Sequence, residues 1–430
     1  AVTTGDYNSA FGFETLKALT TGGENFAFGS QALYTLTTGN YNNAFGSNAL
    51  FAATTSSGNT AFGHHALKAT TTASNSTAVG AYALDANTIG SANQAFGYAA
   101  LSQNTTGSSS TAVGYQALNA ITTNGGCTAV GYEALLVTTG ENNTGVGKGA
   151  LTANTSGAYN TAVGHSALDA NTTDSYNSAL GYQALSANTT GEKNTAVGSF
   201  ALRDSTTSDN NTALGSSALL SNTTGSNNTA VGQGALLTNS TGSNNVAVGD
   251  DALRLNTGSY NTAVGTDCLD DNTASNNTGV GYRALYQNTT GTLLASVGAY
   301  SLTANTTGIR NTAIGYESMS ANTTGSHNTA VGTYALATPT TGNESTAVGY
   351  YACKSATTGM RNVGVGVSAL TNATTGSSNV AVGGFAGKTL TTGSDNTVVG
   401  YDALITATTA SNNTAIGREA LKVSTASSNV

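Results

Sequence analysis

The side chains that most often perform catalysis or bind metals are scattered in this sequence. Its four histidines are His64, His65, His165 and His327. A histidine can act as a metal ligand or general base when a second such group lies nearby. His64 and His65 are adjacent and are expected to point to opposite faces of the chain, and the other two lie far away. We expect all four to be solvated surface residues.

The acidic residues form two close pairs, Asp250–Asp251 and Asp270–Asp271. Carboxylates so placed can attract Ca²⁺, but no stretch resembles an EF-hand loop, so solvation is the simpler interpretation. G-x-S-x-G, H-E-x-x-H and P-loop patterns are also missing from the sequence. These observations predict a protein that is not an enzyme and needs no cofactor or metal.

The cysteine spacing, the net charge and the length of the apolar runs argue against several further classes of protein. Cys127, Cys268 and Cys353 are too far apart for a C-x-x-C motif, which argues against a disulfide framework or a metal site. The net charge is −8, and no Lys/Arg cluster is available to neutralise phosphates, so nucleic acid is not an expected partner. No apolar run approaches the roughly 20 residues that cross a bilayer.

Tyrosine is the residue with the most regular placement among those that bind ligands. Eight tyrosines directly follow a recurring glycine: Tyr98, Tyr115, Tyr132, Tyr182, Tyr282, Tyr316, Tyr350 and Tyr401. One interpretation is that they cover the edge of a core or fill a groove between chains, with the hydroxyl in water. The other is that they form a row of aromatic platforms for sugars or for another surface.

The recurring glycine belongs to a repeat that fills the chain. It occurs at Gly12, Gly29 and Gly46 and continues to Gly417 in steps of 17 residues, with three steps of 16. A fixed period of this size is typical of a stacked array with one structural unit per repeat. We expect residues 1–430 to form a single continuous array, cut from a longer chain because neither end resembles a cap.

Within each repeat, "NTAVG" alternates with period two and "NTTG" has turn chemistry. The sequence therefore predicts an all-β fold, a β-solenoid (β-roll) of about 25 coils with 17 residues per coil. The apolar residue before the glycine and the Leu four residues after it are predicted to form the core, as at Val79, Leu84, Val248, Leu253, Ile314, Val331 and Leu336. The glycine itself is predicted to make the repeat turn, as at Gly80, Gly232, Gly249, Gly315 and Gly332.

A column of small residues lies between the two outer residues of each "TAV". If the outer two face inward, this residue faces outward, and it is almost always Ala: Ala112, Ala162, Ala196, Ala230, Ala247 and Ala313 are examples. Two interpretations stay open: a turn of the same coil folds over the strip, or a neighbouring chain packs against it around a common axis. The thin core and low charge favour the neighbouring chain.

Units such as "NNTAVGQGAL", "NNTAIGREAL" and "NSTAVGAYAL" resemble the head repeats of YadA-like trimeric adhesins. They are also similar to the "NTAVGYQAL…NTTGS" arrays of phage-tail-fibre-like and bacterial surface-fibre proteins. The resemblance covers essentially the whole chain, although the YadA-like head coil is shorter than 17 residues. It implies an extracellular or cell-surface (or virion) homo-oligomeric fibre, a trimer or higher assembly, that presents an adhesive surface.

The leading functional hypothesis is a non-catalytic structural or adhesive segment of an extracellular filament that attaches to another cell or surface, including cell-surface glycans. A phage tail-fibre shaft is an alternative of the same class. A β-solenoid that binds ice or carbohydrate is an alternative of another class. Ice binding requires stacked threonines on a flat face, whereas the paired threonines of "NTTG" lie in a turn.

Overall fold

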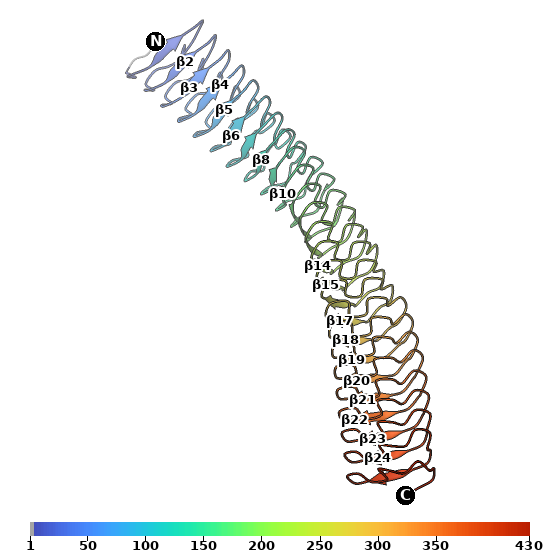
Figure 1. The fold of residues 1–430 in the computed structure, drawn as a ribbon. Helices are drawn as coiled ribbons and strands as arrows, with labels where there is room; N and C mark the ends of the chain where they lie inside the picture. Colours follow the sequence, from blue (N-terminus) through green and yellow to red (C-terminus); the bar gives the residue numbers. More distant parts are fainter. Residues whose placement is uncertain (1–3) are drawn as a thin grey trace. The chain divides into compact units, whose positions relative to one another are not determined.

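The computed structural model describes residues 4–430, which contain 25 three-residue strands and no α-helix. The chain divides into two compact units that meet in sequence between Ala213 and Leu214. Each unit is a stack of coils with one strand per coil (Figure 1).

The first unit contains β1 Ser9–Phe11, β2 Phe26–Phe28, β3 Asn43–Phe45, β4 Thr60–Phe62, β5 Thr77–Val79, β6 Gln94–Phe96, β7 Thr111–Val113, β8 Thr128–Val130, β9 Thr144–Val146, β10 Thr161–Val163, β11 Ser178–Leu180 and β12 Thr195–Val197. Strand β13, Thr212–Leu214, spans the division between the units. The second unit contains β14 Thr229–Val231, β15 Val246–Val248, β16 Thr262–Val264, β17 Thr278–Val280, β18 Ala295–Val297, β19 Thr312–Ile314, β20 Thr329–Val331, β21 Thr346–Val348, β22 Val363–Val365, β23 Val380–Val382, β24 Thr397–Val399 and β25 Thr414–Ile416.

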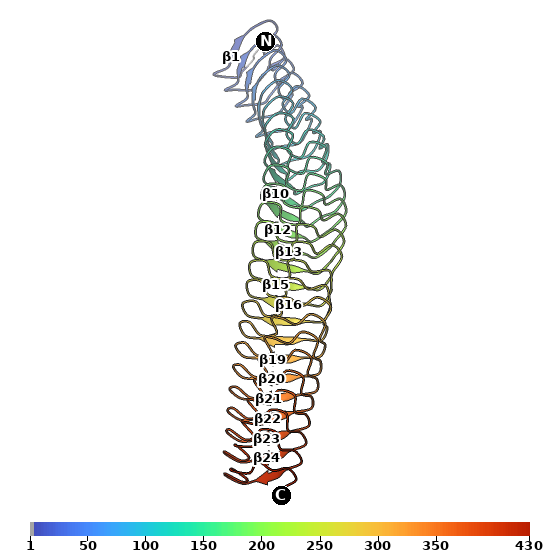
Figure 2. The same cartoon turned by 45° about the vertical axis from the view of Figure 1, so that its right-hand side comes forward.

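Successive strands within each unit pair in parallel and in register. Ala162 of β10, for example, lies opposite Ala179 of β11. The loops are joined in the same way: the Leu84 N–H donates to the Ala100 carbonyl at 3.0 Å, and the Gly97 N–H donates to the Val79 carbonyl at 2.8 Å. Figure 2 shows the strands lying above one another on one side of the coils. The predicted all-β solenoid with about 17 residues per coil is confirmed.

The inward face of the strand is the reverse of the one predicted. The middle residue is buried in every strand from β2 to β25, and the flanking residues are exposed or half-buried. Val248 and Ile314 are 36% and 42% exposed, and Val79 and Val331 are half-buried. Assigning these four to the core was wrong, whereas burial of Leu84, Leu253 and Leu336 is confirmed.

The alanine column is correspondingly inside the coil. The six alanines predicted to form an outward strip are fully buried within their own chain: Ala112, Ala162, Ala196, Ala230, Ala247 and Ala313. Gly145 takes this position in β9, and a Cβ built on it would lie 3.1 Å from Leu135 Cγ. The leucine therefore reaches across the coil to the strand and leaves room for little more than a methyl group.

One column of buried asparagines supports the strand. The Asn160 backbone N–H donates to Asn143 Oδ1 at 2.9 Å, and the Asn177 N–H donates to Asn160 Oδ1 at 2.9 Å. Nδ2 of Asn160 donates to the Asp174 carbonyl of the next coil at 2.9 Å. Each amide thus satisfies a buried backbone group and its own copy in the neighbouring coil.

A second asparagine column lies behind the "NTTG" turn, where Asn171 Nδ2 donates to Asn154 Oδ1 at 2.9 Å. Ile121 interrupts this column, and the column ends at Asn322, since Pro339 and then Ala356 occupy its position in the next coils. Oδ1 of Asn104 and Oδ1 of Asn322 are consequently buried without a hydrogen-bond partner among residues 4–430, because the next coil offers Ile121 or Pro339 in place of an amide.

The predicted turn glycines are confirmed by their backbone conformation. Their φ angles lie between +132° and +138°: Gly80, Gly232, Gly249, Gly315 and Gly332. The stacking of coils adds a second requirement, since a Cβ on Gly80 would lie 2.4 Å from the carbonyl oxygen of Gly97. The column excludes side chains on both grounds.

The core accommodates larger residues in pairs. Cys268 replaces a core alanine, and Gly279 of the following strand lies against it, since a Cβ added to Gly279 would lie 2.6 Å from the Cys268 sulfur. Ser296 and Ser301 replace two facing alanines; their hydroxyls hydrogen-bond to each other, and Ser296 also donates to the Ser301 carbonyl at 3.0 Å. Interior substitutions are therefore coupled across the coil.

We expect Gly279→Ala to lower the free energy of unfolding by about 1–3 kcal/mol, because the added methyl overpacks against the Cys268 sulfur. Adding Cys268→Ala restores the Ala–Ala pair of other coils and should recover most of the loss. Urea unfolding followed by circular dichroism measures both. Equal stability of Gly279→Ala and the parent protein would contradict this account of the core.

Candidate functional site on the coil surface

The histidine side chains do not separate as predicted. The rings of His64 and His65 stack with their centroids 3.9 Å apart, so the expectation of opposite faces was wrong. His65 has a φ of +61°, and this left-handed conformation turns its side chain to the same side as that of His64. Burial and the neighbouring His64 lower the pKa of His65.

One residue of the acidic pairs, Asp270, forms an ion pair with an arginine, and so does the nearby Asp267. Arg254 donates to both carboxylate oxygens of Asp270, at 2.7 and 2.9 Å, and Arg283 donates to Asp267 at 3.0 Å. Burial raises the pKa of Asp270, and the bond to Arg254 opposes that rise. Residues 4–430 contain no group of three or more His, Cys, Asp or Glu side chains placed to hold a metal ion.

The three cysteines are free thiols in the interior. Burial raises the pKa of Cys127, and raises those of Cys268 and Cys353 to about 12. A thiol that is neutral at pH 7 and enclosed is a weak nucleophile. The cysteines therefore serve as small apolar residues of the core.

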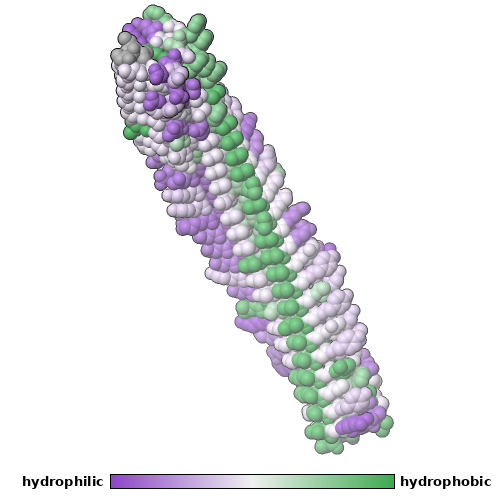
Figure 3. All heavy atoms as spheres, turned by 90° about the vertical axis from the view of Figure 1, so that its left-hand side faces the viewer, coloured by the Kyte–Doolittle hydropathy of each residue, from purple (hydrophilic) through white to green (hydrophobic). Residues whose placement is uncertain are grey.

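In each unit the side chains before the repeated glycines form an exposed line, and we call these side chains the apolar ridge. In the first unit its members are Phe11, Phe28, Phe45, Phe62, Val79, Phe96, Val113, Val130, Val146, Val163, Leu180 and Val197. In the second unit they are Leu214, Val231, Val248, Val264, Val280, Val297, Ile314, Val331, Val348, Val365, Val382, Val399 and Ile416. All are exposed or half-buried, and Figure 3 shows the line of hydrophobic side chains.

The tyrosines predicted to contact ligands are at the surface. Their exposed fractions lie between 40% and 48%: Tyr98, Tyr115, Tyr132, Tyr182, Tyr282 and Tyr316. The first three stack on one another, with centroids 5.5 and 5.3 Å apart and planes within 12°. The six belong to separate groups rather than to a single row.

A second set of aromatic residues, which was not predicted from the sequence, lies two positions after the repeated glycine. Its members, all with positive φ, are Tyr82, Phe200, Tyr300, Tyr334, Tyr351 and Phe385. The left-handed backbone brings this position beside the preceding one, as the 3.9 Å separation of the Tyr350 and Tyr351 rings shows. Recognising that two consecutive positions share one side would have revealed these residues.

Together the two positions build what we call the aromatic edge. In the first unit its longest run of contacting rings is His64, His65, Tyr82, Tyr98, Tyr115 and Tyr132. In the second unit it is Tyr282, Tyr300, Tyr316, Tyr334, Tyr350 and Tyr351. Each run contains a hollow in the surface.

The hollow of the first unit, the Tyr82 hollow, has a volume of about 500 Å³. The Tyr82 and Tyr98 rings meet at 76° with centroids 5.8 Å apart. Asn119 and Gln103, which also line it, are joined by a 3.0 Å hydrogen bond. Oδ1 of Asp85, another lining residue, is buried without a hydrogen-bond partner among residues 4–430, and His65 Nδ1 lies 4.0 Å away.

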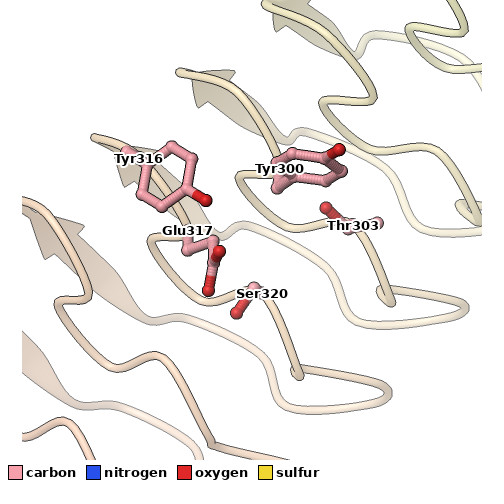
Figure 4. Close-up of a pocket in the computed structure, with 5 residues that line it drawn as sticks. All are labelled: Tyr300, Thr303, Tyr316, Glu317 and Ser320. Atoms are coloured by element: carbon pink, nitrogen blue, oxygen red, sulfur yellow. The ribbon is translucent and has the colours of Figure 1, made fainter.

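The hollow of the second unit, the Tyr300 hollow, has a volume of about 390 Å³ and similar components (Figure 4). The Tyr300 and Tyr316 rings meet at 88° with centroids 6.2 Å apart. Thr303, Ser320 and Glu317 surround the space with two hydroxyls and a carboxylate. The Glu317 carboxylate, which accepts a hydrogen bond from the Tyr316 hydroxyl, raises the pKa of Tyr316 to about 12.

No protein-family model matches this chain, and no curated protein matches it. Among residues 4–430, no helix has the length and hydrophobicity required to cross a membrane.

We expect Glu317→Gln to lower the pKa of Tyr316 from about 12 toward its ordinary value of about 10, since it removes the charged acceptor. In the parent protein the raised pKa stabilises the fold fully below pH about 10, and this contribution disappears as the pH rises through 12. Tyrosine ring-carbon NMR shifts, assigned with Tyr316→Phe, measure the titration. Glu133→Gln is the control and should leave Tyr316 unchanged; an unchanged pKa in Glu317→Gln would contradict the assignment.

Proposed function

We propose that this chain is a non-catalytic structural segment of an extracellular filament, in which copies of the chain associate side by side and present a surface that attaches to another cell or to a solid surface. The apolar ridge carries this proposal. Long exposed apolar surfaces are uncommon on monomeric proteins and mark interaction sites. The ridge has Val, Phe, Leu or Ile in every coil and no charged residue.

A second copy of the same chain fits this ridge best. The coils repeat every 16 or 17 residues at strand spacing, about 4.8 Å, so a ridge meets matching side chains all along an identical partner. Burying exposed valine and phenylalanine side chains contributes about 25 cal/mol per Å² of apolar surface, and the contribution recurs in each coil. A trimer or a higher assembly satisfies this requirement.

The proposed self-association surface is therefore the apolar ridge and not the alanine column that was expected from the sequence. The alanines lie inside their own coil and are inaccessible to a partner. The resemblance to YadA-like head repeats and to phage-tail-fibre-like arrays supports an extracellular or virion fibre. The net charge of −8 and the scattered basic residues argue against nucleic acid as a partner.

We expect a ridge variant carrying Val248→Thr, Val264→Thr and Val297→Thr to associate more weakly, because threonine keeps the shape of valine and adds a hydroxyl that is costly to bury. Sedimentation velocity over a range of concentrations should show the dissociation midpoint rising by about 10-fold or more.

The control carries the same three exchanges at exposed valines outside the ridge, namely Val137, Val367 and Val423. It should sediment as the parent protein does. A parent chain that stays monomeric at high concentration, or a ridge variant that associates as the parent does, would refute side-by-side association through the ridge.

Ice binding is the second candidate, and one observation favours it. Thr and Val of each "TAV" both point outward, as at Thr262 and Val264, so each unit has a parallel sheet face with stacked threonines and valines. The paired threonines of the "NTTG" turns are therefore not the only stacked threonines at the surface. A flat face of regularly spaced hydroxyl and methyl groups suits an ordered water lattice.

If this face binds ice, the protein should produce thermal hysteresis as a monomer, and Thr262→Lys with Thr278→Lys should abolish it by placing bulky charges on the face. A nanolitre osmometer measures the freezing-point gap. Assembly through the ridge would cover the same face, so hysteresis in a dispersed monomer would favour ice binding, and its absence in an associating protein would favour the filament.

A further inference from the structure

We propose that the aromatic edge binds neutral oligosaccharides, with one pyranose ring seated in the Tyr82 hollow and, in the second unit, another seated in the Tyr300 hollow. This inference names a ligand for the attachment function proposed above. It uses a different surface from the ridge, so the two proposals can fail separately.

Aromatic geometry is the first reason. A pyranose has one apolar face of C–H groups, which packs against the electron-rich face of an aromatic ring. Within the stacked tyrosines Tyr98, Tyr115 and Tyr132, neighbouring rings cover each other's faces. At both hollows the adjacent rings are nearly perpendicular, at 76° and 88°, so these two rings do not stack face to face on each other.

The polar groups around the rings are the second reason. Sugar hydroxyls need acceptors and donors at the rim of the platform, and the Tyr82 hollow supplies Asp85, Gln103, Gln116 and Asn119. Oδ1 of Asp85 is buried and has no hydrogen-bond donor among residues 4–430. The Asp85 side chain as a whole is 34% exposed, so its carboxylate can still accept a hydrogen bond from a ligand hydroxyl.

Charge selects the class of sugar. Each hollow has a carboxylate, Asp85 or Glu317, and none of the residues that line either hollow is basic. Anionic sugars such as uronic acids would be repelled, while neutral hydroxyls can donate to the carboxylates. Volumes of about 390 and 500 Å³ lie in the range of small-molecule sites, and both hollows are open, which suits one unit of a longer chain.

The test uses the full chain and saturation-transfer NMR with neutral hexasaccharides of glucose, mannose, galactose and xylose, and with hexagalacturonate as the anionic probe. We expect at least one neutral hexasaccharide to receive saturation, strongest on the C–H face of a ring, and hexagalacturonate to receive none. Failure of all neutral probes, or preferential binding of hexagalacturonate, would overturn the proposal.

Substitutions then locate the site. Tyr82→Ala together with Tyr300→Ala should weaken binding of the neutral hexasaccharide by about 10-fold or more, because both platforms are lost. The matched control is Tyr159→Ala with Tyr176→Ala, which removes a stacked exposed pair from another column and should change affinity less than about 2-fold. Equal losses in the two double variants would place binding outside the hollows.

Two further measurements separate binding from folding and from association. Asp85→Asn keeps the side-chain shape and should still weaken binding while the circular dichroism spectrum is unchanged; full affinity in this variant would overturn the role of Asp85. The ridge variant should lose self-association and keep its affinity for the sugar. Loss of sugar binding in the ridge variant, with the aromatic-edge variants unaffected, would assign the sugar to the ridge and overturn this inference.

Discussion

Every structural feature of this protein depends on the in-register stacking of coils about 4.8 Å apart. Each interior side chain must pack against its own copy above and below. Alanine, leucine and glycine satisfy this condition by size, and asparagine satisfies it by donating to and accepting from its copies. Stacked like charges would repel one another, which agrees with the low charged fraction, 8% of residues.

The sequence alone was sufficient for the period, the solenoid, the leucine column and the turn glycines, because each is a repeated local pattern. It was insufficient to predict which residues of each strand face the interior of the coil. Two arrangements of "TAV" are compatible with alternation, and hydrophobicity alone favours burying Val248 over Ala247. The width of the coil decides otherwise, since the leucine fills the space opposite the strand. Width is a property of the closed coil, so no single repeat reveals it.

Of the two positions that carry the exposed aromatic residues, one and two residues after the repeated glycine, only the first was predicted from the sequence. Tyr98 and Tyr316 were found because they follow the repeated glycine directly. Tyr82 and Tyr300 were not, because their side chains join the same edge only through a left-handed backbone that non-glycine residues adopt at a cost. The hollows exist where the two positions alternate between neighbouring coils, so the site depends on backbone geometry that propensity rules disfavour.

The residues of the interior, the apolar ridge and the aromatic edge vary from coil to coil in different ways. This difference separates the proposed self-association through the ridge from the proposed sugar binding at the edge. Cys268 with Gly279, and Ser296 with Ser301, change together because their side chains contact each other in a filled interior. On the edge, residues change singly from coil to coil, whereas every member of the ridge is apolar. A uniform ridge matches a partner with the same repeat, namely another copy of the chain. A varied edge creates individual hollows, which suit ligands that engage only a few coils.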